Sequence, residues 1–177
     1  ERGYAVRRVL RDPVASASEA LEDVDRLHAA LQEMSDLTIP RTALCSRVMT
    51  FGVYEVMPSD RFVAGRVNQT ILYCEVRNFV SREENGEYRS RFSGRAELLT
   101  PSGDSVWKQE EPSIEDRCTS RRTDFFIAQR LSFPATIPAG EYLLKVTLED
   151  KLAGKVNEAA VPLTVRSASS LATAKEP

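Results

Sequence analysis

The spacing of apolar residues changes once along this chain, and that change restricts the fold more than any other feature of the sequence. From about Pro13 to Met34, apolar side chains recur at steps of three and four, which is the repeat of one face of an α-helix. From Leu44 to Val165 they recur at every second residue, as is typical of β-strands. Pro40 lies between the two regions and predicts that the helix has ended before it.

The helical segment has a single apolar stripe and a well-marked beginning. Asp12 can cap a helix that starts with Pro13, or Ser16 can cap it together with Glu19. A helix of this length is marginal alone, so its stripe predicts packing, either on the sheet region of the same chain or on a helix upstream or in a second copy. The stripe comprises Ala17, Ala20, Val24, Leu27, Leu31 and Met34, and the last four are the candidate interface.

The alternating region divides into short strands separated by Gly, Pro and Asn. Asn85-Gly86 predicts a tight hairpin, and the acidic stretch from Glu110 to Pro112 is expected to be a loop. Seven or eight such strands with no helix between them favour a mainly β fold, an antiparallel sandwich behind an N-terminal amphipathic helix. The expected strands lie near Cys45–Tyr54, Thr70–Phe79, Tyr88–Leu98, Val106–Trp107, Asp124–Phe133, Tyr142–Leu148 and Val156–Val165.

The segment Pro138-Ala139-Gly140-Glu141-Tyr142, followed by alternating Leu144, Val146 and Leu148, is the most informative stretch. It resembles the penultimate hairpin of bacterial immunoglobulin-like and fibronectin-type-III-like domains, where the chain bends at a Pro or Gly and a tyrosine pins the corner. The resemblance implies an immunoglobulin-like β-sandwich in which the Tyr142 hydroxyl anchors the bend. Gly140→Val should do more harm than Tyr142→Phe if the chain needs a positive φ at Gly140. Leu144 stands where antibody-type domains have their second disulfide cysteine.

These observations predict three segments in the chain. Residues 1–40 form an N-terminal segment with the helix, residues 41–166 form the immunoglobulin-like sandwich, and residues 167–177 form a small polar tail that is expected to be disordered.

The charge balance and the length of the apolar runs argue against two classes of partner. Lys plus Arg number 24 against 26 for Asp plus Glu, a net charge of -2, so there is no global positive field to hold nucleic acid. No apolar run approaches the roughly 20 residues that a membrane-spanning helix needs. A protein partner, or self-association through the helix, is the expectation that remains.

The inventory of reactive residues does not favour an enzyme. His28 is the only histidine, so a Ser-His or Cys-His catalytic pair would have to use it, and its place in the charged helix predicts an exposed side chain. No Cys-x-x-Cys pair and no glycine-rich phosphate loop occur. We therefore expect no catalytic residues, no metal and no cofactor.

Three cysteines leave the redox compartment open. Cys74 alternates with Leu72 and Val76, which predicts a small buried thiol, whereas a disulfide between Cys45 and Cys118 is an alternative for the other two. The compartment is undecided by this count, and a periplasmic or secreted location is preferred over a cytoplasmic one.

Arginines gather on one expected strand face. Pairing with carboxylates on the solvent face is one reading, and a binding patch for an anionic ligand is the other. Trp107 and Tyr73 could stack on a sugar, although a lone tryptophan in a sandwich more often lies in the core. The candidate patch comprises Arg89, Arg91, Arg95, Arg121 and Arg122.

The sequence therefore predicts a non-catalytic interaction or structural module, part of a larger bacterial protein, that binds a protein partner. The alternative is a sandwich that binds a carbohydrate or another anionic ligand. Exposure of Trp107 and Tyr73 would separate the two readings.

Overall fold

The computed structural model describes residues 17–58 and 61–168 of the chain. It divides into two compact units, residues 1–36 and residues 37–177, and each is considered by itself. The expected helix caps at Asp12, Pro13 and Ser16 lie outside the described residues, as does nearly all of the tail.

The described part of the first unit is one helix, α2, which spans Ala17–Met34. Arg26 pairs along the helix with Glu22 at 3.2 Å and with Asp23 at 3.3 Å, the spacings at which helical side chains meet. Just after its last residue, the Ser35 amide and the Ser35 hydroxyl both donate to the Leu31 carbonyl, at 2.9 and 2.7 Å. His28 is exposed on this helix, as expected.

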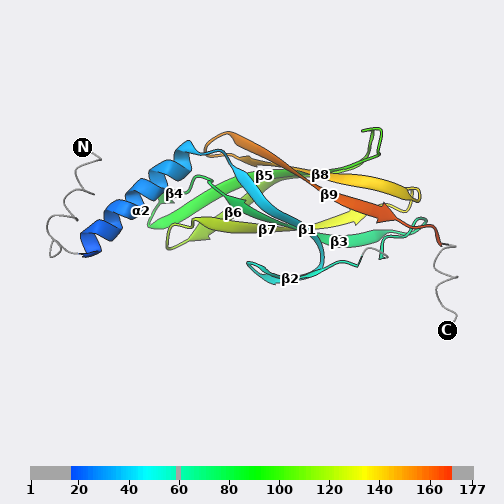
Figure 1. Cartoon of the computed structure of the whole chain (residues 1–177), viewed down its shortest axis with the longest axis horizontal. Helices are drawn as coiled ribbons and strands as arrows, with labels where there is room; N and C mark the ends of the chain where they lie inside the picture. Colours follow the sequence, from blue (N-terminus) through cyan, green and yellow to red (C-terminus); the bar gives the residue numbers. More distant parts are fainter. Residues whose placement is uncertain (1–16, 59–60, 169–177) are drawn as a thin grey trace. The chain divides into compact units, whose positions relative to one another are not determined.

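The second unit is a sandwich of two antiparallel sheets (Figure 1). One sheet has the strand order β2-β1-β3-β7, and the other has the order β6-β5-β8-β9, with short β4 beside the beginning of β5. The first sheet consists of β1 (Thr38–Thr50), β2 (Val53–Val56), β3 (Asn68–Arg77) and β7 (Asp124–Phe133). The second consists of β4 (Arg82–Glu84), β5 (Glu87–Leu99), β6 (Ser105–Cys118), β8 (Gly140–Asp150) and β9 (Lys155–Val165).

This strand order is that of an immunoglobulin domain. The orders β1-β3-β7 and β6-β5-β8-β9 correspond to strands A-B-E in one sheet and C′-C-F-G in the other. The corner before β8 agrees, because the Tyr142 hydroxyl donates to the Pro138 carbonyl at 3.0 Å. The prediction of a mainly β, immunoglobulin-like sandwich is confirmed. Gly140 does not have a positive φ, so the condition under which Gly140→Val would strain the backbone is not met.

The core lies between the sheets and follows the alternation of the sequence. Phe92 and Leu98 of β5 and Leu144 of β8 are buried against Leu72 of β3 and Phe133 of β7. The residues of β5 that alternate with the buried ones point outward, and they include Arg89, Arg91 and Arg95, as predicted. At the other end of β8, the buried Asp150 carboxylate accepts the amides of Val80 and Leu152 at 2.7 and 2.9 Å.

One expectation about the strands is wrong, and two short strands were not expected. The acidic stretch Glu110–Pro112 was expected to be a loop but lies inside β6, where Glu110 pairs with Arg95 in the ladder. The described residues also hold nine strands rather than seven or eight, because Phe51-Gly52 turns the chain into the short β2, and β4 precedes the Asn85-Gly86 hairpin. Both residues of that hairpin have positive φ, at 57° and 79°, as a tight turn requires.

The outer face of the four-stranded sheet carries a second buried cluster. The Tyr73 ring lies 4.3 Å from the Tyr54 ring, and its hydroxyl accepts the Gly52 amide at 2.8 Å. The same hydroxyl donates to Glu75, whose carboxylate lies 3.8 Å from Arg41. The β1–β2 hairpin therefore folds onto the sheet from outside and buries residues that the alternation assigns to solvent.

Candidate interaction surfaces

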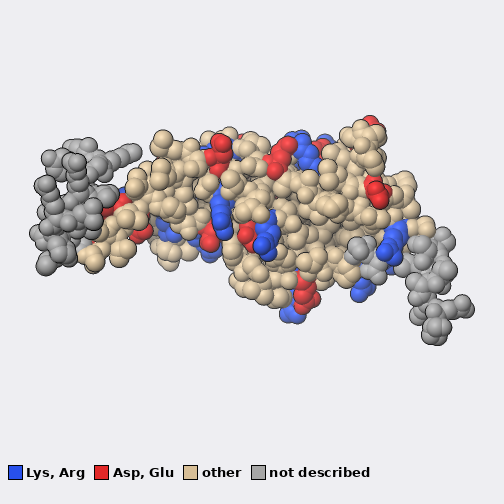
Figure 2. All heavy atoms as spheres, in the orientation of Figure 1, with Lys and Arg blue, Asp and Glu red and all other residues tan. Residues whose placement is uncertain are grey.

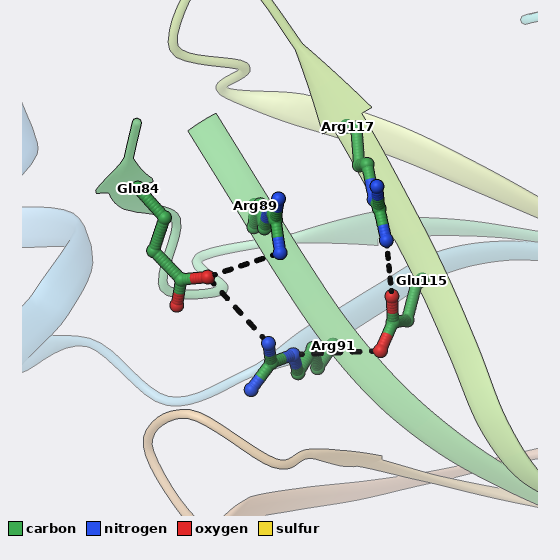
Figure 3. Close-up of polar contacts among 5 residues, drawn as sticks. All are labelled: Glu84, Arg89, Arg91, Glu115 and Arg117. Carbon is green, nitrogen blue, oxygen red and sulfur yellow. Dashed lines mark hydrogen bonds and ion pairs between the residues drawn. The ribbon is translucent and has the colours of Figure 1, made fainter. Parts of the chain in front are cut away.

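The predicted arginine patch is a network of ion pairs on the outer face of the five-stranded sheet. Arg89 and Arg91 of β5 both reach Glu84 of β4, at 3.3 and 3.6 Å (Figure 3). On the other side of β5, Glu115 of β6 pairs with Arg91 and with Arg117, each at 3.5 Å. We call these five residues the arginine–carboxylate network.

The strand register explains why carboxylates are needed here. Arg82, Arg89 and Arg117 lie directly opposite one another on β4, β5 and β6. Like charges facing each other across strands are destabilising, and Glu84 and Glu115 offset that repulsion. Exposed pairs of this kind contribute about 0 to 1 kcal/mol each, so the network organises charge more than it stabilises the fold.

The other predicted arginines are spread beyond this network. Arg95 lies further along β5 and pairs with Glu97 at 3.9 Å. Arg121 and Arg122 are in the loop between β6 and β7, where Arg122 pairs with Asp116 at 3.1 Å and lies 6.0 Å from the Phe125 ring centroid. On the side of the molecule that Figure 2 presents, Lys and Arg side chains are likewise interspersed with Asp and Glu. Because Arg89, Arg91, Arg95 and Arg122 each have a carboxylate partner, the pairing interpretation fits these arginines better than an anion site.

Cys118 is at the end of β6, close to that loop. Hydrogen bonds from Ser120, and then the Arg122 guanidinium, lower the pKa of its thiol. Burial has the opposite effect on the cysteines of the other sheet, raising the pKa of Cys45 and raising that of Cys74 to about 12. All three thiols are free, so the alternative of a Cys45–Cys118 disulfide is not what the structure has.

The aromatic residues considered for sugar stacking do not form an exposed platform. Tyr73 is fully buried in the outer cluster, and Trp107 packs edge-on against Phe133 with ring centroids 4.6 Å apart. They also belong to different sheets. The interpretation of the tryptophan as a core residue fits better.

The candidate helix interface is exposed. Leu21, which the sequence spacing had not singled out, is exposed like the predicted residues. These five side chains, which we call the α2 stripe, are 44 to 79% exposed; they are Leu21, Val24, Leu27, Leu31 and Met34.

The described residues contain no further reactive cluster. Within residues 17–58 and 61–168, no group of three or more His, Cys, Asp or Glu is placed to hold a metal ion. Over the same residues, no helix combines the length and apolar character that crossing a membrane takes. Sequence reasoning missed Asp150 and Glu75 as buried carboxylates, since nothing in the alternation separates a buried acid from an exposed one.

Fold and surfaces together define an immunoglobulin-like β-sandwich module with charge-paired outer strands. No family model matches the chain, and no curated protein matches it. Among solved structures, it is similar to the C-terminal domain of wzt, at 15% identity over 74% of each chain with a TM-score of 0.43. An immunoglobulin-like protein from Pseudomonas aeruginosa is 13% identical over 75% of this chain and 98% of the other, with a TM-score of 0.37.

A β-glucuronidase from Bacteroides uniformis is also similar, at 8% identity over 73% of this chain with a TM-score of 0.40. The chain spans only 13% of the length of that enzyme. The fold assignment rests on the strand order and the Tyr142 corner rather than on these likenesses.

Proposed function

We propose that this chain is a non-catalytic interaction module, part of a larger bacterial protein, which binds a protein partner through the α2 stripe. The observation that carries the proposal is the exposure of five large apolar side chains along one 18-residue helix. Single exposed apolar residues are normal on proteins, whereas a contiguous row of them marks an interaction site.

The stripe has the spacing that helix recognition uses. Val24, Leu27, Leu31 and Met34 follow one another at steps of three and four, which lines them up as anchors for an apolar groove or a second helix. Burying such a side chain contributes about 1.5 to 3 kcal/mol. Several of them together supply the apolar core that a specific interface needs.

The alternative of an anionic ligand has weaker support. Arg89, Arg91, Arg95 and Arg122 each have a carboxylate within 4.0 Å, so an anion would have to displace an existing partner.

The test compares variants that add two carboxylates on or off the stripe. Leu27→Glu with Leu31→Glu places them on it, and Ser18→Glu with Ala29→Glu is the matched control on the other side of the helix. Each full chain is used as bait, retained proteins are identified by mass spectrometry, and the mass of the chain itself is measured by light scattering. We expect one protein, or a second copy, to be retained by the parent and the control and lost with the stripe variant. Retention that is equal for all three chains contradicts the proposal.

A further inference from the structure

Strand β7 is a long sheet edge without the usual protection. Proteins guard their edge strands with short length, proline, bulges, charged side chains, above all lysine, or a covering segment. At the opposite edge of its sheet, β2 has only 4 residues; in the other sheet, β9 contains Pro162, and β6 contains Pro112 beside a register shift. β7 has 10 residues with no proline, and it pairs with β3 without a break in register.

The direction of its backbone groups follows from one hydrogen bond. The Gln109 side chain, on β6 of the other sheet, donates to the Arg130 carbonyl at 2.8 Å, so this carbonyl points away from β3. In an antiparallel strand, every second residue turns both its amide and its carbonyl toward the same neighbouring strand position. Asp124, Phe126 and Ala128 therefore also present their backbone groups at this edge.

The space beside the open edge of β7 is not filled by side chains of the residues that the structure describes. A hollow of about 490 Å³ lies between β6 and β7 and is lined by Ile114, Phe125 and Ile127 among others. Gln129 also lines it, is only 9% exposed, and its amide nitrogen has no hydrogen-bond partner in the described part of the chain. A buried donor without a partner is uncommon in a finished interior.

We propose that β7 pairs antiparallel with β7 of a second copy of this chain, with the two-fold axis at Ile127. In this register Asp124 of each copy faces Arg130 of the other, and Phe126 faces Ala128. Asp124 and Arg130 are both exposed; within their own chain Asp124 interacts electrostatically with Arg122, which also pairs with Asp116. Each facing pair of outward residues exchanges two backbone hydrogen bonds.

Charge complementarity selects this register over its neighbours. A shift by one residue would place residues whose backbone groups point away from β3 opposite residues whose backbone groups point toward β3. An axis at Phe126 would bring Arg130 against Arg122 of the other copy, and an axis at Ala128 or Gln129 would leave Asp124 without an opposite charge. Opposite charges across a strand pair are favourable and like charges are not. The Arg130 carbonyl can keep its bond from Gln109, because a carbonyl oxygen has two lone pairs.

The experiment measures the dimer dissociation constant of the full chain by analytical ultracentrifugation. All proteins carry Leu27→Glu and Leu31→Glu, so that association through the α2 stripe does not contribute and failure of the proposed function leaves this result unaffected. We expect a concentration-dependent dimer. Arg130→Asp should raise its dissociation constant roughly tenfold or more, and adding Asp124→Arg should restore it.

A backbone variant provides the second arm. Ala128→Pro removes an amide that points away from β3, a position where proline is tolerated at a sheet edge, and it should weaken the dimer, whereas the control Ala128→Ser should not. Circular dichroism checks that each variant is folded; if the proline variant is not, the exposed charge pair alone decides. A chain that stays monomeric at every concentration, or a charge swap that does not restore association, overturns the proposal.

Discussion

The outward face of β3 and the outward face of β5 look alike in the sequence but have different surroundings. On β3, Tyr73 is 0% and Glu75 is 8% exposed, because the β1–β2 hairpin folds over them. On β5, the Arg89 and Arg91 side chains remain 22% and 41% exposed and are held by Glu84 and Glu115. Alternation thus identifies which residues share a face, but it does not say whether that face is covered.

The covered face should matter more for stability, and Tyr73→Ala tests this most strongly. Removing a buried aromatic ring and leaving a cavity should lower the free energy of unfolding by about 3 to 5 kcal/mol. Urea unfolding followed by circular dichroism measures the loss. The control Tyr73→Phe keeps the ring but removes the hydroxyl that bonds Gly52 and Glu75, and should cost about 1 to 2 kcal/mol. A Tyr73→Ala loss below that of the phenylalanine variant would show that the hairpin does not cover this face.

The corner that leads from one sheet to the other should have an intermediate effect. Tyr142→Phe removes the hydrogen bond to the Pro138 carbonyl and should lower the free energy of unfolding by about 1 kcal/mol. The same urea titration measures it. An unchanged midpoint would contradict the role of the hydroxyl in pinning the corner.

The exposed face should matter little. Arg91→Ala breaks the contacts with Glu84 and Glu115 and should change the free energy of unfolding by less than about 1 kcal/mol, because exposed ion pairs contribute little. Any difference should shrink in 1 M salt, where charges are screened. Arg47→Ala, an exposed arginine of the other sheet, is the control. A loss comparable to that of Tyr73→Ala would remove the distinction between the two faces.

Thiol reactivity should distinguish the sheets without affecting stability. The thiolate is the reactive form, so the lowered pKa of Cys118 predicts faster labelling at neutral pH than at Cys74, whose pKa is about 12. Arg122→Gln removes one cause of that lowering, which should raise the pKa of Cys118 and slow its labelling at pH 7. The difference should vanish above the pKa of the thiol, where both variants are thiolates. Labelling by iodoacetamide with mass spectrometry follows each site, and Cys74 reacting first would show that its burial is wrong.

Local signals in the sequence predicted the elements that have a strong local cause. The strand Asp124–Phe133 was predicted with the bounds that the structure has, since Phe125, Ile127, Leu131 and Phe133 recur on one face and only Gln129 interrupts their alternation. Asn85-Gly86 and the Tyr142 corner were predicted from turn residues that few other conformations suit. The strand through Glu110–Pro112 was missed, because acidic residues and a proline are typical of loops, and only the neighbouring β5 makes them a strand.

The candidate surfaces divide in the same way. The sequence placed Arg89, Arg91 and Arg95 on one face and Val24, Leu27, Leu31 and Met34 on one stripe, because both follow from the repeat of the backbone. It could not choose Glu84 and Glu115 as partners, since they come from strands whose register is set by a hairpin and a bulge.

What the sequence determined by itself is therefore periodicity: a helix with one apolar stripe, then strands whose apolar side chains point to a common core. Only the tertiary structure decided which outward face is covered by a hairpin, which arginines are neutralised and which strand edge stays open. The physical reason is that backbone repeats act over a few residues, whereas burial and pairing depend on segments that are far apart in the chain, such as Tyr54 and Tyr73 or Glu84 and Arg91.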